Sequence, residues 1–209
     1  MSGERFYEAP AVARRRSAPA ALRNREPITE VLRKWLPPSG LVLEIASGTG
    51  EHVIYFAEHL PGLTWQPSDI HPDALASIRA WRDEAGLPNI GEPLTVDASS
   101  PEWPIDRADA VLSINMVHIS PWSSALGLIE GAARILSSGA PLILYGPWLK
   151  GDIATVASNL AFDADLQRRD PRWGLRRVED FADSAKRHFD LAETRAMPAN
   201  NLMLLLHRR

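Results

Sequence analysis

The chain has 209 residues, of which 45% are hydrophobic and 23% charged, a composition typical of a globular domain. The net charge of −3 supplies no positive field for nucleic acid or an anionic membrane. The absence of cysteine excludes disulfides, thiolate metal sites and thiol nucleophiles, and agrees with a cytoplasmic protein. No apolar run approaches the about 20 residues that span a bilayer, and no export signal follows Arg14–Arg16. We expect neither a membrane nor a nucleic-acid partner.

Residues 1–26 are expected to form an N-terminal arm that serves as a lid, because Arg, Pro, Ala and Ser occur there without a clear period. A helix is predicted to begin at Pro27, a residue suited to the first helical position. Apolar residues follow at helical spacing as far as Trp35, and Pro37 ends the pattern.

Short apolar runs then alternate with amphipathic segments. Strands are predicted at 41–45, 63–66, 94–97, 110–114 and 141–145, and helices at 51–60, at 72–85 and from Ser120-Pro121 to Gly139. This alternation predicts an α/β fold with a Rossmann-like, doubly wound and mostly parallel sheet.

The rhythm changes after Gly146. Residues 147–188 are polar and partly helical, and we interpret them as an insertion and a second lid. Strands are predicted at 189–194 and 202–207, and their short connection favours an antiparallel last strand. Residues 27–209 are therefore expected to form one domain.

The strongest functional motif follows the first predicted strand. Gly48 and Gly50 allow a tight turn that leads into a helix, and Asp69 ends the next strand 19 residues later. An acid at this spacing can accept hydrogen bonds from a ribose. The pattern indicates a nucleoside-containing ligand, although a plain turn and a helix cap would use the same residues.

A nicotinamide dinucleotide is the less favoured ligand. The third glycine of the dinucleotide fingerprint is replaced by Val53, and no Walker lysine is present. An oxidoreductase therefore remains an alternative function.

The string L-E-I-A-S-G-T-G resembles the first motif of class I S-adenosylmethionine-dependent methyltransferases, with Ala46 in place of the usual first glycine. Several longer strings, spread over about residues 18 to 207, resemble the methyltransferase-like protein twenty-six family. These are P-A-A-L-R-N-R-E-P-I, L-E-I-A-S-G-T-G-E-H, W-Q-P-S-D, I-N-M-V-H-I-S-P-W, Y-G-P-W, R-D-P-R-W-G and M-P-A-N-N. The resemblance implies the cofactor S-adenosyl-L-methionine and the product S-adenosyl-L-homocysteine.

The resemblance also assigns cofactor contacts to residues at the ends of four strands. They are Glu44 with Ala46, Ser47, Gly48, Thr49 and Gly50 for the methionine part, Asp69 for the ribose, Asp97 and Ala98 for the adenine, and Asn115 and Met116 for the sulfonium side. The residue types agree with these roles, since Asp97 can accept from the adenine amine and Ile70 offers the ring an apolar face. The helix start at Glu51 is expected to receive the methionine carboxylate. For Asp97 a capping role is an equal alternative.

Few catalytic groups are expected, because an activated methyl group mainly needs alignment and exclusion of water. His118 is the candidate base, with a structural hydrogen-bonding role as the alternative. No metal site is predicted, since His52 and His59 are seven residues apart with no third ligand nearby.

Aromatic and basic residues after the fourth and fifth sheet strands are candidates for binding the methyl acceptor. They are Trp122, Tyr145 and Trp173 for an aromatic pocket, and Arg172 and Arg176 for clamping an anion. The alternative is that the tryptophans are core residues and that the arginines pair with neighbouring aspartates on the surface.

Together these features predict a methyltransferase that acts on a small molecule, with an anionic acceptor suggested by the arginines. A nucleic-acid acceptor is not expected, because the loop I-N-M-V-H-I lacks the Asn-Pro-Pro-aromatic pattern. The main alternative is a non-catalytic protein that binds S-adenosylmethionine and acts through a protein partner. The sequence leaves the oligomeric state open.

Overall fold

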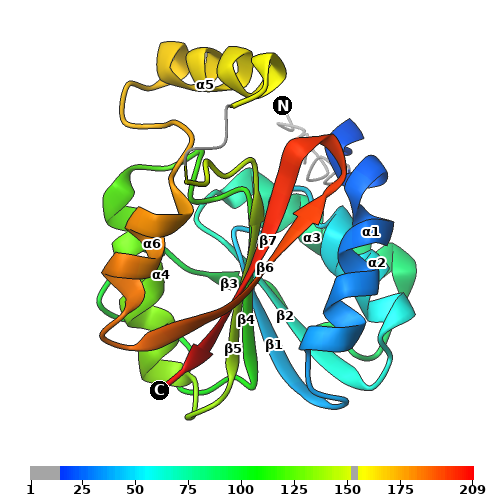
Figure 1. Cartoon of the computed structure of the whole chain (residues 1–209). Helices are drawn as coiled ribbons and strands as arrows, with labels where there is room; N and C mark the ends of the chain where they lie inside the picture. Colours follow the sequence, from blue (N-terminus) through cyan, green and yellow to red (C-terminus); the bar gives the residue numbers. More distant parts are fainter. Residues whose placement is uncertain (1–14, 152–154) are drawn as a thin grey trace, which may run out of the picture.

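A single mixed sheet organises the chain (Figure 1). The structure is a computed structural model that describes residues 15–151 and 155–209. Seven strands follow the order β3-β2-β1-β4-β5-β7-β6. Six of them run in the same direction, and β7 runs in the opposite direction. The predicted doubly wound, mostly parallel α/β fold with an antiparallel last strand is confirmed.

The elements lie close to their predicted positions. The strands are β1 (Gly40–Ile45), β2 (Leu63–Asp69), β3 (Leu94–Thr95), β4 (Ala110–Ile114), β5 (Pro141–Gly146), β6 (Phe189–Met197) and β7 (Asn201–Arg208). The helices are α1 (Pro19–Trp35), α2 (Glu51–His59), α3 (Pro72–Ala85), α4 (Trp122–Ile135), α5 (Ala157–Arg169) and α6 (Val178–Ala185), with a short 3-10 turn η1 (Pro198–Asn200).

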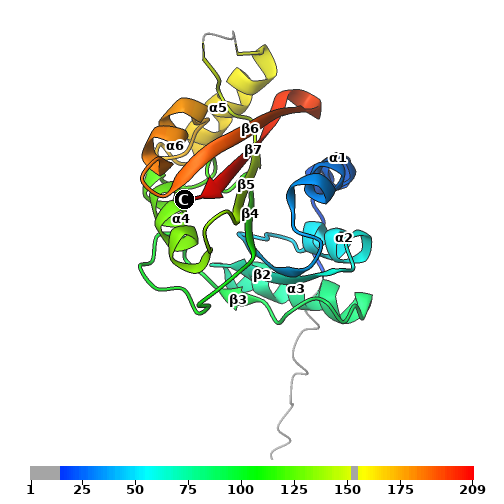
Figure 2. The same ribbon diagram turned by 60° about the horizontal axis from the view of Figure 1, so that its bottom comes forward.

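Helices cover both faces of the sheet (Figure 2). α1, α2 and α3 lie on one side, where Ile28, Leu32 and Phe56 are fully buried, and α4 and α6 lie on the other, where Leu128 and Phe181 are buried. Every residue of β4 and β5 is buried as a result. This burial explains why the central strands read as continuous apolar runs in the sequence.

The first helix differs from the prediction. It begins at Pro19 rather than Pro27, so residues 19–26, assigned to the arm, form its first two turns. Proline is tolerated in a first turn, and Pro19 already meets that rule eight residues earlier. Pro27 lies inside the helix. Ala21 and Ile28, on either side of it in the sequence, are buried and hold the helix against the sheet. The arm residues 1–14 lie outside the described residues.

The segment expected to be an insertion divides into two parts. α6 belongs to the core, since Phe181 and Ala185 are fully buried beside α4. α5 lies apart from the two helical layers, at the edge of the sheet (Figure 1), and buries only Asn159 and Leu166. Only α5 is therefore an addition to the layered fold.

Strand directions decide which loops can meet a ligand. β6 runs parallel to β5, because both pair antiparallel with β7. The turn Pro198–Asn200 therefore lies at the same edge as the carboxyl ends of β1, β4 and β5. In the described chain no helix is long and apolar enough to cross a membrane.

The packing of α4 predicts a sensitive glycine. A Cβ atom at Gly131 would lie 2.1 Å from Cζ2 of the buried Trp103. We expect Gly131→Ala to lower the free energy of unfolding by roughly 1–3 kcal/mol, measured in urea, because a rigid indole cannot yield. The exposed Ser123 of the same helix is the control, and Ser123→Ala should change stability by less than about 0.5 kcal/mol. Equal stability of Gly131→Ala and the wild type would contradict this packing.

Candidate functional site

The turn between β1 and α2 exposes its backbone. Ala46, Gly48 and Gly50 all have positive φ angles, of 60°, 60° and 92°. A Cβ atom at Gly48 would meet no protein atom within 4 Å, so the backbone is open to a ligand there. At Gly50 a Cβ would lie 3.0 Å from the Ile78 Cα, so this glycine serves the packing of α2 on α3. The two glycines therefore have different tasks.

Asp69 connects this turn to the next strand. Its Oδ2 accepts a hydrogen bond from the Gly48 N–H at 3.0 Å, and its Oδ1 accepts from the His71 N–H at 2.9 Å. The side chain is almost buried, at 4% exposure. Each carboxylate oxygen keeps a further lone pair, so a ribose hydroxyl can still donate to it. Asp69 is thus placed beside the open part of the turn, as the motif predicts.

Glu44 is the most unusual group of the site. It is 1% exposed, and its Oε2 has no hydrogen-bond partner among the described residues. Burial raises the pKa of its carboxyl to about 7, opposed by a hydrogen bond with Ser47 and assisted by the negative charge of Asp69. A buried carboxylate oxygen without a partner is costly. A ligand ammonium group would supply the missing donor.

The predicted adenine side lies at the ends of β2 and β3. Val96 N–H donates to the Asp69 carbonyl at 3.2 Å, so these two strand ends are neighbours. Ile70 is 47% exposed beside them, which suits an apolar face for a ring, whereas Ala98 is buried. Asp97 Oδ1 accepts from both the N–H and the hydroxyl of Ser99, at 2.8 and 2.7 Å. These bonds form a turn at residues 97–99 and no helix begins there, so Asp97 is not a helix cap and its contact with the adenine stays a prediction.

The start of α2 does not match the expectation for a carboxylate site. The Glu51 side chain is buried there and accepts hydrogen bonds from the Ser17 and Thr49 hydroxyls and the Ala18 N–H. A second carboxylate beside Glu51 would be repelled. The structure therefore argues against the methionine carboxylate at this helix start.

The side chains of Asn115 and Met116, which follow β4, lie in different surroundings. Asn115 has a φ of 64°, a conformation that asparagine tolerates, and its side chain reaches a pocket. Met116 is 6% exposed and packs in the core, with its sulfur accepting from the Ser120 hydroxyl at 3.3 Å. Only Asn115 of this pair is placed to face a ligand.

His118 is fully buried. Its Nδ1 accepts from the Arg176 N–H at 3.3 Å, and its Nε2 has no partner among the described residues. Burial, aided by the charge of Arg176, lowers its pKa to about 3. A group with so low a pKa is a weak base at neutral pH. The catalytic role of His118 stays a prediction that this environment disfavours.

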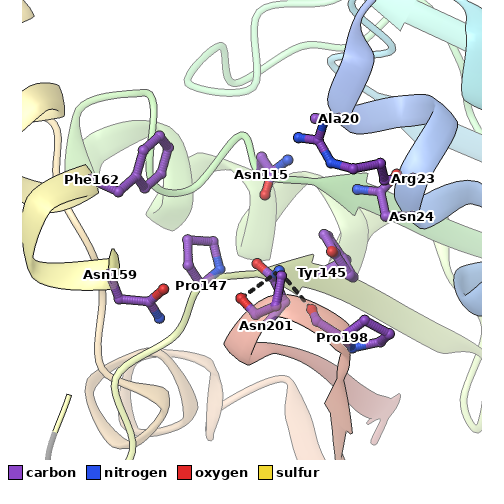
Figure 3. A pocket seen from close by; sticks show the side chains of 11 residues that line it. Ala20, Arg23, Asn24, Asn115, Tyr145, Pro147, Asn159, Phe162, Pro198 and Asn201 are labelled. Carbon is purple, nitrogen blue, oxygen red and sulfur yellow. Dashed lines mark hydrogen bonds between the residues drawn. The ribbon is translucent and has the colours of Figure 1, made fainter. Parts of the chain in front are cut away.

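A pocket of about 570 Å³ opens beside Asn115 (Figure 3). Its walls come from α1, from the ends of β4 and β5, from α5 and from the β6–β7 turn. The lining residues are Ala20, Arg23, Asn24, Asn115, Tyr145, Pro147, Asn159, Phe162, Pro198, Ala199 and Asn201. Burial raises the pKa of the Tyr145 hydroxyl, so that it stays neutral.

Most of the expected acceptor residues lie elsewhere. Of the five candidates only Tyr145 lines this pocket. Arg172 pairs with Asp170 at 2.7 Å on the surface, as its alternative supposed. The Arg176 guanidinium donates to the backbone carbonyls of Val117, Ser120 and Arg172. These bonds give Arg176 a structural role. The arginine clamp stays a prediction, which these existing partners of Arg172 and Arg176 disfavour.

The two tryptophans also belong to other surroundings. Trp122 lies under the Arg176 guanidinium at 5.5 Å and packs edge-on against Phe181. Trp173 is half-buried in the turn before α6, and its backbone N–H donates to the Asp170 carbonyl. Neither side chain is part of the pocket at Asn115.

The sequence interpretation missed Arg23, Asn24 and the β6–β7 turn. Both regions fall in strings that carry the family resemblance, P-A-A-L-R-N-R-E-P-I and M-P-A-N-N. Strand direction was the further signal, because an antiparallel last strand brings the second string to the ligand edge.

Comparison with known proteins places this geometry in a family. A family model described as "Protein of unknown function (DUF938)" matches residues 15–208. The chain belongs to this family.

Solved structures of methyltransferases share the fold. An O-methyltransferase family protein from Burkholderia thailandensis is 20% identical, with a TM-score of 0.74 over 90% of this chain and 57% of its own. An O-methyltransferase family 2 protein from Planctomyces limnophilus, in complex with apigenin, is 17% identical, with a TM-score of 0.78 over 91% of this chain and 58% of its own. CalO1, a methyltransferase in calicheamicin biosynthesis in its SAH-bound form, is 12% identical, with a TM-score of 0.72 over 91% of this chain and 54% of its own.

This chain therefore spans between 54% and 58% of these three proteins. At identities of 12% to 20% the likeness establishes the fold, which is that of class I methyltransferases.

Ala46 provides a test of the glycine turn. An L-residue in the left-handed region costs about 1–2 kcal/mol, and glycine avoids this cost while gaining less than about 1 kcal/mol of entropy in the unfolded chain. We expect Ala46→Gly to raise the free energy of unfolding by about 0.5–1 kcal/mol. Ala80→Gly, in the middle of α3, should lower it by a similar amount. A destabilised Ala46→Gly would show that the φ of 60° is not strained.

Glu44 provides a second test. Its pKa of about 7 lies above the ordinary 4.5, so the folded state loses stability as pH rises from about 4.5 to 7. Glu44→Gln should therefore stabilise the ligand-free protein by roughly 3 kcal/mol at pH 8 and have little effect at pH 4. Glu30→Gln, on the exposed side of α1, is the control. Parallel stability curves for Glu44→Gln and the wild type across this pH range would refute the burial argument.

Proposed function

We propose that the protein is an S-adenosylmethionine-dependent methyltransferase that acts on a small molecule. The observation that carries this proposal is the unpartnered, buried Glu44 carboxylate beside Asp69 and the open backbone of Gly48. An ammonium and a sulfonium group suit these acids. The class I methyltransferase fold, and a neighbour solved with SAH bound, support the same cofactor.

The proposed division of labour follows the strand ends. The Glu44 carboxylate would accept from the amino group of the cofactor, Asp69 would accept from its ribose, and Ile70 would pack on its adenine. When bound, the cofactor would supply an activated methyl group on positively charged sulfur. Asn115 lies between the Glu44 end and the pocket, where it orients the acceptor.

The pocket beside Asn115 supports an enzyme over a non-catalytic binding protein. A binding module has no need of a cavity of about 570 Å³ next to its cofactor. The oxidoreductase alternative is less favoured, because the buried Glu51 carboxylate at the start of α2 would repel a pyrophosphate.

Three finer statements belong to this proposal. The absence of cysteine and the net charge of −3 support a cytoplasmic protein that needs neither nucleic acid nor a membrane. The apigenin complex of one neighbour supports a small-molecule acceptor. The exposed position of α5 over the pocket supports its use as a lid.

Calorimetry with S-adenosylhomocysteine and, separately, NAD tests the proposal. We expect the wild type to bind S-adenosylhomocysteine and not NAD. Asp69→Asn and Glu44→Gln should each weaken binding at least about tenfold, because each removes a charge-assisted hydrogen bond. Asp73→Asn is the matched control, since Asp73 is exposed on α3. Binding of NAD without S-adenosylhomocysteine would overturn the proposal.

A further inference from the structure

The edge of the sheet formed by the carboxyl ends of the parallel strands carries opposite charge in its two halves. Glu44, Asp69 and Asp97 lie at the ends of β1, β2 and after β3, on the side proposed for the cofactor. The pocket beside Asn115 is lined by no carboxylate among the described residues, and Arg23 is the cation in its wall. A cationic cofactor and an acceptor of opposite charge would fit this division.

Arg23 is available to a ligand. It lies in the second turn of α1, is exposed, and makes no ion pair or hydrogen bond within the described parts of the chain. Its positive charge lowers the pKa of the Tyr145 hydroxyl, against the larger effect of burial, so the guanidinium is close to that hydroxyl. The other arginines predicted for this task are consumed by Asp170 and by backbone carbonyls. Arg23 therefore replaces them as the anion-binding candidate.

Amide side chains beside Arg23 are already oriented. His52 Nε2 donates to the Asn24 Oδ1 at 2.7 Å, so the Asn24 NH₂ group is turned toward the Tyr145 hydroxyl and the pocket. The Asn201 Nδ2 donates to the carbonyls of Pro198 and Ala199, at 3.0 and 3.2 Å. Both amide hydrogens of Asn201 are thus used within the β6–β7 turn, and the NH₂ group of Asn24 is the preoriented donor next to the guanidinium.

The other end of the pocket has apolar walls from Phe162 and Pro147, beside Asn159, whose Nδ2 donates to the Asn200 carbonyl. In the view of Figure 3 Asn115 lies between Phe162 of α5 and Arg23 of α1, and Pro147 lies below it. A ligand that fills this space has an apolar body and one charged end. A single planar guanidinium matches a carboxylate, whereas a phosphate dianion is usually met by several cations.

We propose that the methyl acceptor is a small carboxylic acid, whose carboxylate pairs with Arg23 and whose body packs on Phe162 and Pro147. The atom to be methylated then lies beside Asn115. This inference rests on the proposed function, since it assigns the adjoining space to the cofactor.

A panel of small aromatic and aliphatic hydroxy acids, each paired with its primary amide, tests the inference. Binding to the protein saturated with S-adenosylhomocysteine is measured by ligand-observed NMR and calorimetry. We expect the best acid to bind at least about tenfold more tightly than its amide, because only the acid forms a charge-assisted pair. Arg23→Met should abolish that preference, and Arg23→Lys should restore part of it. Arg33→Met, an exposed arginine of the same helix, should leave it intact.

The outcomes separate the two proposals. No binding of S-adenosylhomocysteine by the wild type would overturn the proposed function itself. Binding of S-adenosylhomocysteine without any preference for an acid over its amide would overturn only the acceptor class. Loss of S-adenosylhomocysteine binding in Arg23→Met would overturn it too, because Arg23 would then hold the carboxylate of the cofactor.

Discussion

The site depends on a backbone constraint at the ends of two neighbouring strands. Ala46 follows β1 and Asn115 follows β4, and both have φ angles near +60°. β1 and β4 lie side by side in the middle of the sheet, where the strand order reverses. Because the chain turns sharply after each of them, the two loops separate and the space between them is open to ligands. The residues proposed to hold the cofactor and the pocket proposed for the acceptor both border that space.

Burial sets the chemistry on either side of this opening. On the β1 side the Glu44 carboxylate is buried, its Oε2 has no partner among the described residues, and burial raises its pKa because the charged form is desolvated. On the β5 side the buried groups are a neutral tyrosine and a neutral histidine. Buried tyrosine and histidine are common in cores, whereas a buried carboxylate oxygen without a partner is rare. The placement of Glu44 is understandable when a positively charged ligand contributes the missing interaction.

The predictability of the fold follows from the central strands. Runs such as Leu41–Ile45 are apolar because both faces of the sheet are covered. The number of strands and their positions along the chain were therefore visible in the sequence. The glycine turn and Asp69 were also predictable, because local geometry demands those residue types. The start of α1 was missed, since a proline inside a helix looks like a helix start when tertiary burial is unknown.

The residues that line the pocket beside Asn115 were harder to predict, because they come from segments far apart in the chain. Arg176 and Arg172 stood beside aromatic residues in the sequence, yet local carbonyls and an aspartate bind them. Arg23 stood alone and gave no pattern. Only the three-dimensional course of α1 over the ends of β4 and β5 brings it to Tyr145.

The peripheral position of α5 has a consequence for how this protein family can diversify. Its thirteen residues bury only Asn159 and Leu166, although Phe162 forms one wall of the pocket. Most substitutions in this helix therefore leave the stability of the layered core unaltered. Mutation and selection can vary the shape of one wall while the cofactor half stays constant, so related chains can evolve toward different acceptors without passing through unstable intermediates.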